Sequence, residues 1–389
     1  MNFFFEKIKN KKDSQSDFII FDDTNSNLIQ QIIPQGYTFS IFKTRPVELI
    51  LFPSILLKIL KNIIFLRPFQ KFTSNKNFIT NILWQLLCIY IKSYIELANP
   101  KAVITSIDNC TKFAWLSKHI PEIPFVSIQN GFRLGYAVDD ECLYHSQHFF
   151  CFGKYEELNF PKRSWNVDNF YPVGSLYASL NFKKFYDTSE KEFDILVISC
   201  WRGNIGFQKD VEDSMKAMKL FDIELAQYLK ENNLKASVIM RSERLSSDWY
   251  MPEIGMNEEE YYYSIYGENI TITDVDFNER NVYQQILKSE FILAAFPSTC
   301  LFEALGIGKK VLYCDYTNHD NYFSEIPDNI LYKGARRELL ADRLSNIIRD
   351  DGSKYQEICK SYKSMFMNID SSIHTQDIIK TKILDILKH

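Results

Sequence analysis

Short apolar runs alternate with helical stretches along most of the chain. The helical stretches repeat apolar residues every three or four positions, as 78–97 does through Ile79, Ile82, Leu83 and Leu86. Strands that are buried on both faces form such continuous apolar runs, so the alternation predicts α/β units with parallel sheets. The clearest predicted strands are 17–22, 102–107, 125–128, 195–199, 236–240, 270–273, 291–296 and 311–314.

The alternation occurs in two halves, which a charged stretch without clear periodicity separates. A length of 389 residues also favours two domains, because single cores seldom grow past roughly 300 residues. We therefore predict an α/β fold of two Rossmann-like, doubly wound domains that face each other across a cleft. The predicted parts are an N-terminal domain, a linker, a C-terminal domain and a C-terminal helix able to pack back on the first domain, at 1–181, 182–193, 194–370 and 371–389.

The stretch 290–316 predicts the most informative single unit. A strand leads into the turn at Ser298 and Thr299, then into a short helix that carries Glu303, and a second strand follows. Open α/β sheets bind ligands at the carboxyl ends of their strands, and a helix N-terminus there favours an anion. Glu303 suits a ribose diol better than a phosphate. The alternative is that the turn only caps its helix.

Other polar residues follow predicted strands in both halves. The first half supplies Asp108, Asn109, Gln129, Asn130 and Arg133, and the second half supplies Arg202, Arg241 and Arg244. Arginines suit a diphosphate, whereas amides with one carboxylate suit a sugar hydroxyl, with Asp108 as a candidate base or nucleophile. An exposed Trp201 or Tyr283 is expected to stack on a base or sugar.

Each of these residues also has a purely structural explanation. Asp108 can cap the helix that begins at Thr111, and Asn130 with Gly131 is a ready turn former. The arginines can form surface ion pairs that contribute little to stability. Their joint position at strand ends is what favours a site.

Composition narrows the function classes. The chain is 46% hydrophobic and 24% charged, as in ordinary globular proteins, and its net charge of −4 argues against a nucleic-acid binder. It contains neither a glycine-rich dinucleotide motif nor a P-loop. Eight scattered cysteines without a Cys-x-x-Cys pair, and no histidine at ligand spacing, predict reduced thiols and no metal site. Without a signal-peptide pattern or a run of about 18 apolar residues, a cytoplasmic protein is expected.

One segment combines large apolar residues with cations only. No acidic residue occurs between Glu48 and Glu96, and the segment 55–72 reads ILLKILKNIIFLRPFQKF. It is either a core helix with solvated lysines or a surface that rests on an anionic membrane or holds an anionic lipid-linked acceptor. The second alternative would place the protein on the inner face of the cytoplasmic membrane.

Four segments resemble the bacterial surface-carbohydrate biosynthesis proteins, which belong with GT-B type glycosyltransferases and include Kdo transferases of lipopolysaccharide, O-antigen or capsule synthesis. The segments are ITSIDN (104–109), VSIQNGFR (126–133), HFFCFGKY followed by YPVGS, and FPSTCLFEALGIGKKVLYCDYT. The resemblance covers roughly residues 95 to 320. It implies a nucleotide-sugar in the C-terminal domain, an acceptor in the N-terminal domain and no cofactor or catalytic metal.

Carried onto this chain, the resemblance implies that the Ser298-Thr299 turn and Glu303 hold the nucleotide and that Gln129, Asn130 and Arg133 line the cleft. The chain lacks the His-Pro pair that several CMP-sugar transferases have at the second strand end of the donor domain. Arg241-Ser242 stands there instead, so a CMP-linked donor stays one alternative among the nucleotide-sugars.

The predicted function is transfer of a sugar, such as Kdo or another acidic sugar, from a nucleotide-sugar donor to a surface glycan or lipid-linked acceptor. Two alternatives stay open. One is a polyol-phosphate transferase or nucleotide-sugar epimerase on the same scaffold, and the other is a non-catalytic nucleotide-sugar or glycan-binding subunit.

Overall fold

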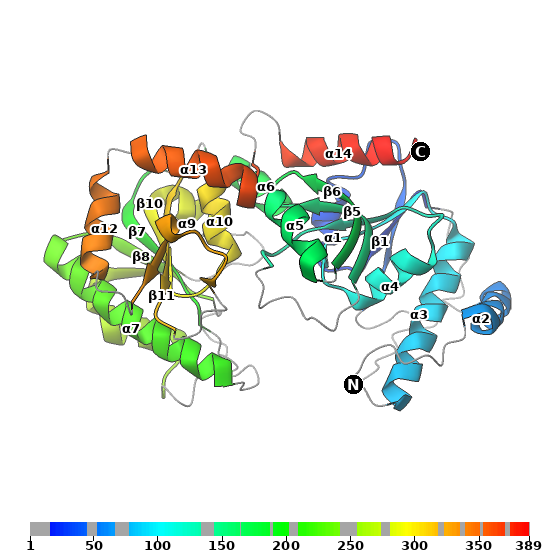
Figure 1. Ribbon diagram of the computed structural model, residues 1–389, viewed down its shortest axis with the longest axis horizontal. Helices are drawn as coiled ribbons and strands as arrows, with labels where there is room; N and C mark the ends of the chain where they lie inside the picture. The colour runs from blue at the N-terminus through cyan, green and yellow to red at the C-terminus, as the bar shows by residue number, and fades with distance from the viewer. Residues whose placement is uncertain are drawn as a thin grey trace. The chain divides into compact units, whose positions relative to one another are not determined.

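The chain folds into two compact units (Figure 1). The computed structural model describes residues 16–44, 53–66, 78–133, 144–163, 165–186, 190–201, 209–241, 255–273, 281–317, 323–334, 339–350, 353–369 and 374–388. The first unit consists of Met1–Gly131, Val138–Leu176 and Ser372–His389. The second consists of Phe132–Ala137 and Tyr177–Ser371.

The first unit contains a parallel sheet of six strands in the order β2-β1-β3-β4-β5-β6. Its strands are β1 (Phe18–Phe21), β2 (Phe39–Phe42), β3 (Ala102–Thr105), β4 (Phe125–Ile128), β5 (Tyr144–Cys151) and β6 (Trp165–Pro172). Its helices are α1 (Ser26–Gln30), α2 (Pro53–Leu66), α3 (Phe78–Ala98), α4 (Thr111–His119), α5 (Lys154–Asn159), the 3-10 turn η2 (Phe160–Arg163) and α14 (Thr375–Ile386).

The second unit repeats this design with the strand order β12-β11-β10-β7-β8-β9, again entirely parallel. Its strands are β7 (Phe193–Ile198), β8 (Ala236–Ile239), β9 (Ile270–Thr273), β10 (Ser289–Ala294), β11 (Lys310–Asp315) and β12 (Leu331–Lys333). Its helices are α6 (Leu176–Phe185), α7 (Lys209–Asn232), α8 (Glu258–Tyr266), α9 (Val282–Lys288), α10 (Thr299–Gly306), α12 (Leu340–Arg349) and α13 (Ser353–Phe366), with 3-10 turns η5 (Gly267–Asn269) and η6 (Asp328–Ile330).

Both cores form because the central strands are apolar on both faces. The strands FIIF, AVIT and FVSI of β1, β3 and β4 are buried at every position, as parallel strands between two helical layers must be. Helices α3 and α4 pack on them, and Ile89, Phe113 and Phe125 belong to one apolar cluster. In the second unit, Asp222 of α7 accepts hydrogen bonds of 2.7 Å from the hydroxyls of Tyr261 and Tyr266, which hold α8 against α7.

The strand orders locate the ligand-binding crevice of each sheet. Renumbered from β7, the second sheet has the order 3-2-1-4-5-6 of dinucleotide-binding sheets, and its direction of winding reverses between β7 and β10. In the first sheet the reversal lies between β1 and β3. Ligands bind such sheets outside the carboxyl ends of the strands at this reversal.

The predicted fold class is confirmed: two six-stranded parallel sheets with flanking helices form a two-domain α/β fold of the GT-B type (Figure 1). The predicted linker begins inside a helix, because α6 extends to Phe185. Strand β6, which was not among the clearest predicted strands, begins at Trp165 and pairs in parallel with β5. Among the helices that the structure describes, none is long and apolar enough to cross a membrane.

Candidate active site

Asp108 lies beyond the carboxyl end of β3, at the reversal point of the first sheet. Its side chain is fully buried, with 0% of its surface exposed. Asp108 is not the cap of α4, because the N-cap position belongs to Cys110. Burial raises the pKa of Glu156 to about 8 and also raises the pKa of Tyr144, and the negative charge of Asp108 adds to both shifts. A buried carboxylate is costly, and perturbed, buried carboxylates are common at functional sites, so Asp108 is a candidate functional group.

Gln129 connects β4 to a second buried carboxyl group, Glu156 of α5. Its amide nitrogen donates to Glu156 Oε1 at 2.8 Å and to the Gly131 carbonyl at 3.0 Å, and its amide oxygen accepts from the Phe152 N–H at 2.8 Å. Gly153 N–H donates to Glu156 Oε2 at 3.2 Å. Burial raises the pKa of Glu156 to about 8, so the group carries its proton at neutral pH.

This raised pKa predicts how the stability of the protein depends on pH. The folded protein keeps a proton on Glu156 that the unfolded chain releases above the ordinary value of 4.5. The protonated Glu156 therefore makes its full contribution to the free energy of unfolding below about pH 4.5, and this contribution is lost as the pH rises towards about 8. Glu156→Gln should make the decline of the unfolding free energy shallower by up to roughly 1.4 kcal/mol per pH unit.

Denaturant unfolding at several pH values between 5 and 8 would measure this slope. Glu157→Gln is the matched control, because Glu157 is the exposed neighbour on the same helix. Equal slopes for the wild type and Glu156→Gln would show that Glu156 does not hold the proton.

Asp22 was not predicted, although it ends β1 at the same reversal point. It is buried and has a φ of 81°, a left-handed conformation that non-glycine residues rarely adopt. Its carboxylate accepts hydrogen bonds from the Thr44 hydroxyl and, at 3.0 Å, from the Thr24 N–H. Backbone strain of this kind concentrates at functional sites, and the only signal in the sequence was an aspartate directly after a strand.

The turn between β10 and α10 lies at the reversal point of the second sheet. Ser298 is the N-cap residue of α10, but its side chain makes no capping hydrogen bond. The Thr299 hydroxyl accepts from the Phe132 N–H at 2.9 Å, and the Phe132 ring stacks on Phe302 with centroids 4.1 Å apart. Simple side-chain capping therefore does not explain this turn.

Glu303 is buried on the fifth position of α10, with 3% exposure. The Tyr283 hydroxyl of α9 donates to its Oε1 at 3.3 Å. The prediction that Trp201 or Tyr283 is exposed for stacking was wrong, because both rings are buried. The Trp201 ring packs against Tyr261 with centroids 5.2 Å apart, and the Ser199 hydroxyl accepts a hydrogen bond from the backbone N–H of Trp201.

Glu258 is a buried carboxylate that sequence reasoning missed. It accepts hydrogen bonds from the Arg241 N–H at 2.9 Å and from the Ser199 hydroxyl, so it joins the carboxyl ends of β7 and β8. The sequence gives no sign of this, because Glu258 is one of three consecutive glutamates. Arg241 is exposed after β8, while Arg202 and Arg244 lie outside the described residues.

The predicted residues that the structure describes follow strands of one sheet or the other. Asp108, Asn109, Gln129 and Asn130 belong to the first unit. The second unit contains Arg133, Arg241, Ser298, Thr299 and Glu303. Within the described ranges, no group of three or more histidine, cysteine or acidic side chains is arranged to hold a metal ion.

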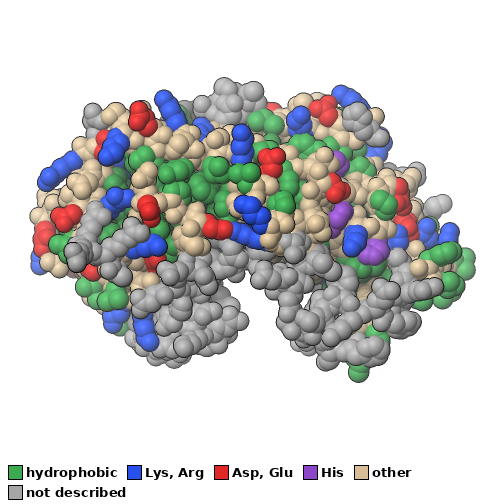
Figure 2. Space-filling model, viewed as in Figure 1, with side chains coloured by type: hydrophobic (Ala, Val, Ile, Leu, Met, Phe, Trp, Pro, Cys, Tyr) green, Lys and Arg blue, Asp and Glu red, His purple; other side chains and the backbone are tan. Residues whose placement is uncertain are grey.

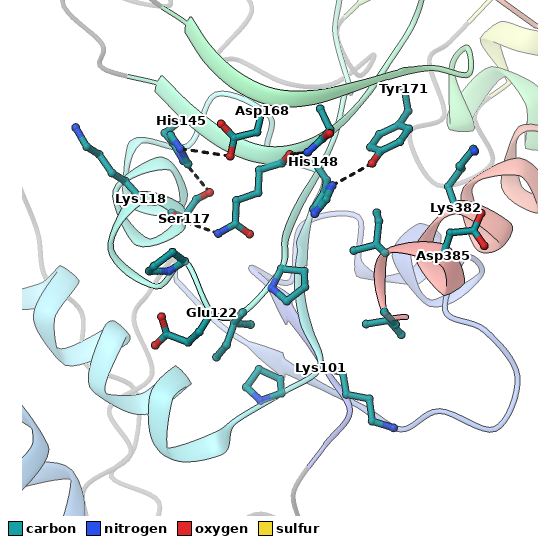
Figure 3. Close-up of a pocket in the computed structure, with 18 of the residues that line it drawn as sticks. Lys101, Ser117, Lys118, Glu122, His145, His148, Asp168, Tyr171, Lys382 and Asp385 are labelled. Atoms are coloured by element: carbon teal, nitrogen blue, oxygen red, sulfur yellow. Dashed lines mark hydrogen bonds and ion pairs between the residues drawn. The ribbon is translucent and has the colours of Figure 1, made fainter. Parts of the chain in front are cut away.

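A pocket of about 970 Å³ lies in the first unit, near the amino ends of the strands, and none of the predicted residues lines it (Figure 3). His145 Nδ1 lies 3.0 Å from the Ser117 hydroxyl, and its Nε2 lies 3.8 Å from Asp168. Because Ser117 is fully buried, its hydroxyl cannot reach a substrate, and Ser117, His145 and Asp168 do not form a nucleophilic triad. Burial lowers the pKa values of His145 and His148. The pocket is lined by equal numbers of lysines and carboxylates, so its charge favours neither an anionic nor a cationic ligand.

Several solved structures resemble the chain over nearly its whole length, among them two with TM-scores above 0.5. A UDP-GlcNAc 2-epimerase from Neisseria meningitidis bound to UDP-GlcNAc has a TM-score of 0.55 at 14% identity, covering 95% of this chain and 99% of that chain. A CDPG-soaked variant of the wall teichoic acid polymerase TagF has a TM-score of 0.52 at 14% identity, covering 97% and 91%. At this identity the likeness shows the fold.

Sequence comparisons add no relative: neither a family model nor a curated protein matches the chain.

Proposed function

We propose that the protein is a nucleotide-sugar-dependent glycosyltransferase of bacterial surface-carbohydrate biosynthesis. The observation that carries the proposal is the second sheet, whose strand order places the β10–α10 turn and Glu303 at the reversal between β7 and β10. This is where dinucleotide-binding sheets place their ligand. The α10 N-terminus offers N–H groups and positive dipole charge to a phosphate, and Glu303 offers a carboxylate to a ribose.

The remaining candidate residues would divide the chemistry as follows. Arg241, together with Arg202 and Arg244, would neutralise the nucleoside phosphate as it leaves, when negative charge develops on it. Asp108 would act on the acceptor hydroxyl or the sugar carbon as base or nucleophile. No step in this scheme requires a metal ion. The family resemblance favours a lipopolysaccharide, O-antigen or capsule glycan as acceptor and Kdo or another acidic sugar as the transferred group.

A second candidate function is epimerisation of a nucleotide-sugar or transfer of a polyol phosphate. The two similar structures favour it, because one is a UDP-GlcNAc 2-epimerase and the other is a wall teichoic acid polymerase. Incubating the protein with the donor alone separates epimerisation from either transfer reaction, since only an epimerase changes the donor without an acceptor.

A thermal-unfolding panel of CMP, UDP, GDP, CDP and dTDP tests the donor site. A ligand at 100 times its dissociation constant stabilises the folded state by about 2.7 kcal/mol. We expect one of the five nucleotides to raise the unfolding temperature clearly more than the other four. No shift with any of the five would contradict a nucleotide site in the second unit.

A further inference from the structure

Helix α2 has two apolar faces, and one of them is used inside the protein. Ile55 is buried, and Ile59 and Ile63 pack partly buried against the core cluster that α3 supplies. The Asn62 amide donates to the Ser93 hydroxyl at 3.0 Å and to Glu96 Oε2 at 2.9 Å. These contacts fix the rotation of α2 about its axis, and so they determine which residues point outward.

The outward face of α2 consists of Leu56, Leu57, Leu60, Ile64 and Phe65. Leu57, Leu60 and Ile64 are 70%, 58% and 75% exposed, and their spacing of three and four residues places them on one stripe. In the space-filling view, hydrophobic side chains gather where α2 lies (Figure 2). Contiguous exposed apolar surface of this kind marks an interaction site.

The neighbouring helix α3 continues the pattern. Its exposed apolar residues Ile79, Leu83 and Leu86 also follow a helical stripe. Helix α2 packs beside α3 (Figure 1). A solvated face would carry polar residues at these positions, so the core-helix alternative considered for 55–72 accounts for one face of α2 only.

The charges near the outward face are positive. Lys61 is exposed within it, with its Nζ 6.0 Å from the centre of the Phe65 ring. The sequence has no acidic residue from 49 to 95, and Glu96 is occupied by Lys58 at 3.2 Å and Lys92 at 2.7 Å. A symmetric contact with a second copy would therefore bring lysines together without a carboxylate between them.

We propose that the outward face of α2 rests on a membrane surface containing anionic lipid. Its leucine, isoleucine and phenylalanine side chains enter the boundary between headgroups and acyl chains, while Lys61 remains at the headgroups. The proposal names a partner of the protein and does not depend on the transferase activity. If both hold, the membrane contact brings the protein to lipid-linked acceptors.

Flotation of the full chain with vesicles tests the proposal. Vesicles of phosphatidylcholine alone are compared with vesicles that also contain phosphatidylglycerol, at low and high salt. We expect binding to the anionic vesicles that decreases with salt, and a decrease on the order of 100-fold for Leu60→Glu combined with Ile64→Glu. Lys61→Glu should weaken binding to anionic vesicles only.

The matched control is Leu220→Glu combined with Ile223→Glu, because both residues are exposed apolar positions on α7 of the second unit. It should float like the wild type, and sedimentation and thermal unfolding show whether each variant is folded. Equal flotation of the α2 variant and the wild type, or no flotation of the wild type, would overturn the proposal. The proposal would also be overturned if the wild type formed a dimer that the α2 substitutions dissociate while flotation stays unchanged.

Discussion

Replacing Asp108 with asparagine should reduce sugar transfer by roughly 10²- to 10⁴-fold, the usual contribution of a positioned acid or base. Asparagine keeps the shape of the buried side chain and removes its charge, so the fold should survive. Because Asp108 lies in the first unit and the predicted nucleotide residues lie mainly in the second, nucleotide affinity should not change. Nucleotide release in the presence of acceptor and calorimetric titration with the nucleotide measure the two quantities separately.

Asp168→Asn provides the matched control for Asp108→Asn. It makes the same chemical change in the same unit, but Asp168 lines the pocket near the amino ends of the strands. Its activity should equal that of the wild type. Full activity of Asp108→Asn would remove Asp108 from the mechanism, and a parallel loss of nucleotide affinity would show that its role is not chemical.

Replacing Glu303 with glutamine should raise the dissociation constant of the nucleotide by roughly tenfold or more. A hydrogen bond to a charged group contributes about 1.5 to 3 kcal/mol, and 1.4 kcal/mol corresponds to a factor of ten. The ribose diol would lose a carboxylate acceptor, whereas the turnover number at saturating donor should remain within a few-fold of the wild type. Calorimetric titration with the nucleotide identified in the unfolding panel measures the effect.

Tyr283→Phe distinguishes binding from packing at this position. It removes the hydroxyl that donates to Glu303 and leaves the carboxylate in place. If the carboxylate binds the ribose, Tyr283→Phe should retain most of the affinity that Glu303→Gln loses. An equal loss in both variants would mean that Glu303 only supports the local packing of α9 and α10.

The strands of the central sheets were predictable because parallel strands must be apolar on both faces. The runs at 102–107, 125–128 and 291–296 contain β3, β4 and most of β10 for this reason. One element was missed: α6 was assigned partly to a linker, because the sequence LYASLNFKKF from Leu176 to Phe185 shows little amphipathic contrast. The spacing of apolar residues predicts a helix or strand only where at least one face of that element is consistently buried.

The candidate site was predictable only in outline. Residues that follow strands, such as Asp108 and Glu303, could be found because sheet topology gathers strand ends. Glu156 and Glu258 could not, since each becomes important through contacts with distant parts of the chain, namely Gln129 and the Ser199–Arg241 strand ends. Nothing in the sequence near Trp201 indicated that its ring is buried against Tyr261.

The most direct test of the proposed function follows a labelled sugar. A nucleotide-sugar built on the nucleotide that stabilises the protein most is incubated with the purified chain, with and without a lipid and glycan extract. The proposed function predicts that the label enters the extract and that free nucleotide appears only when donor, protein and extract are combined. A donor that is converted to its epimer without extract, or one that binds and is never consumed, would contradict it.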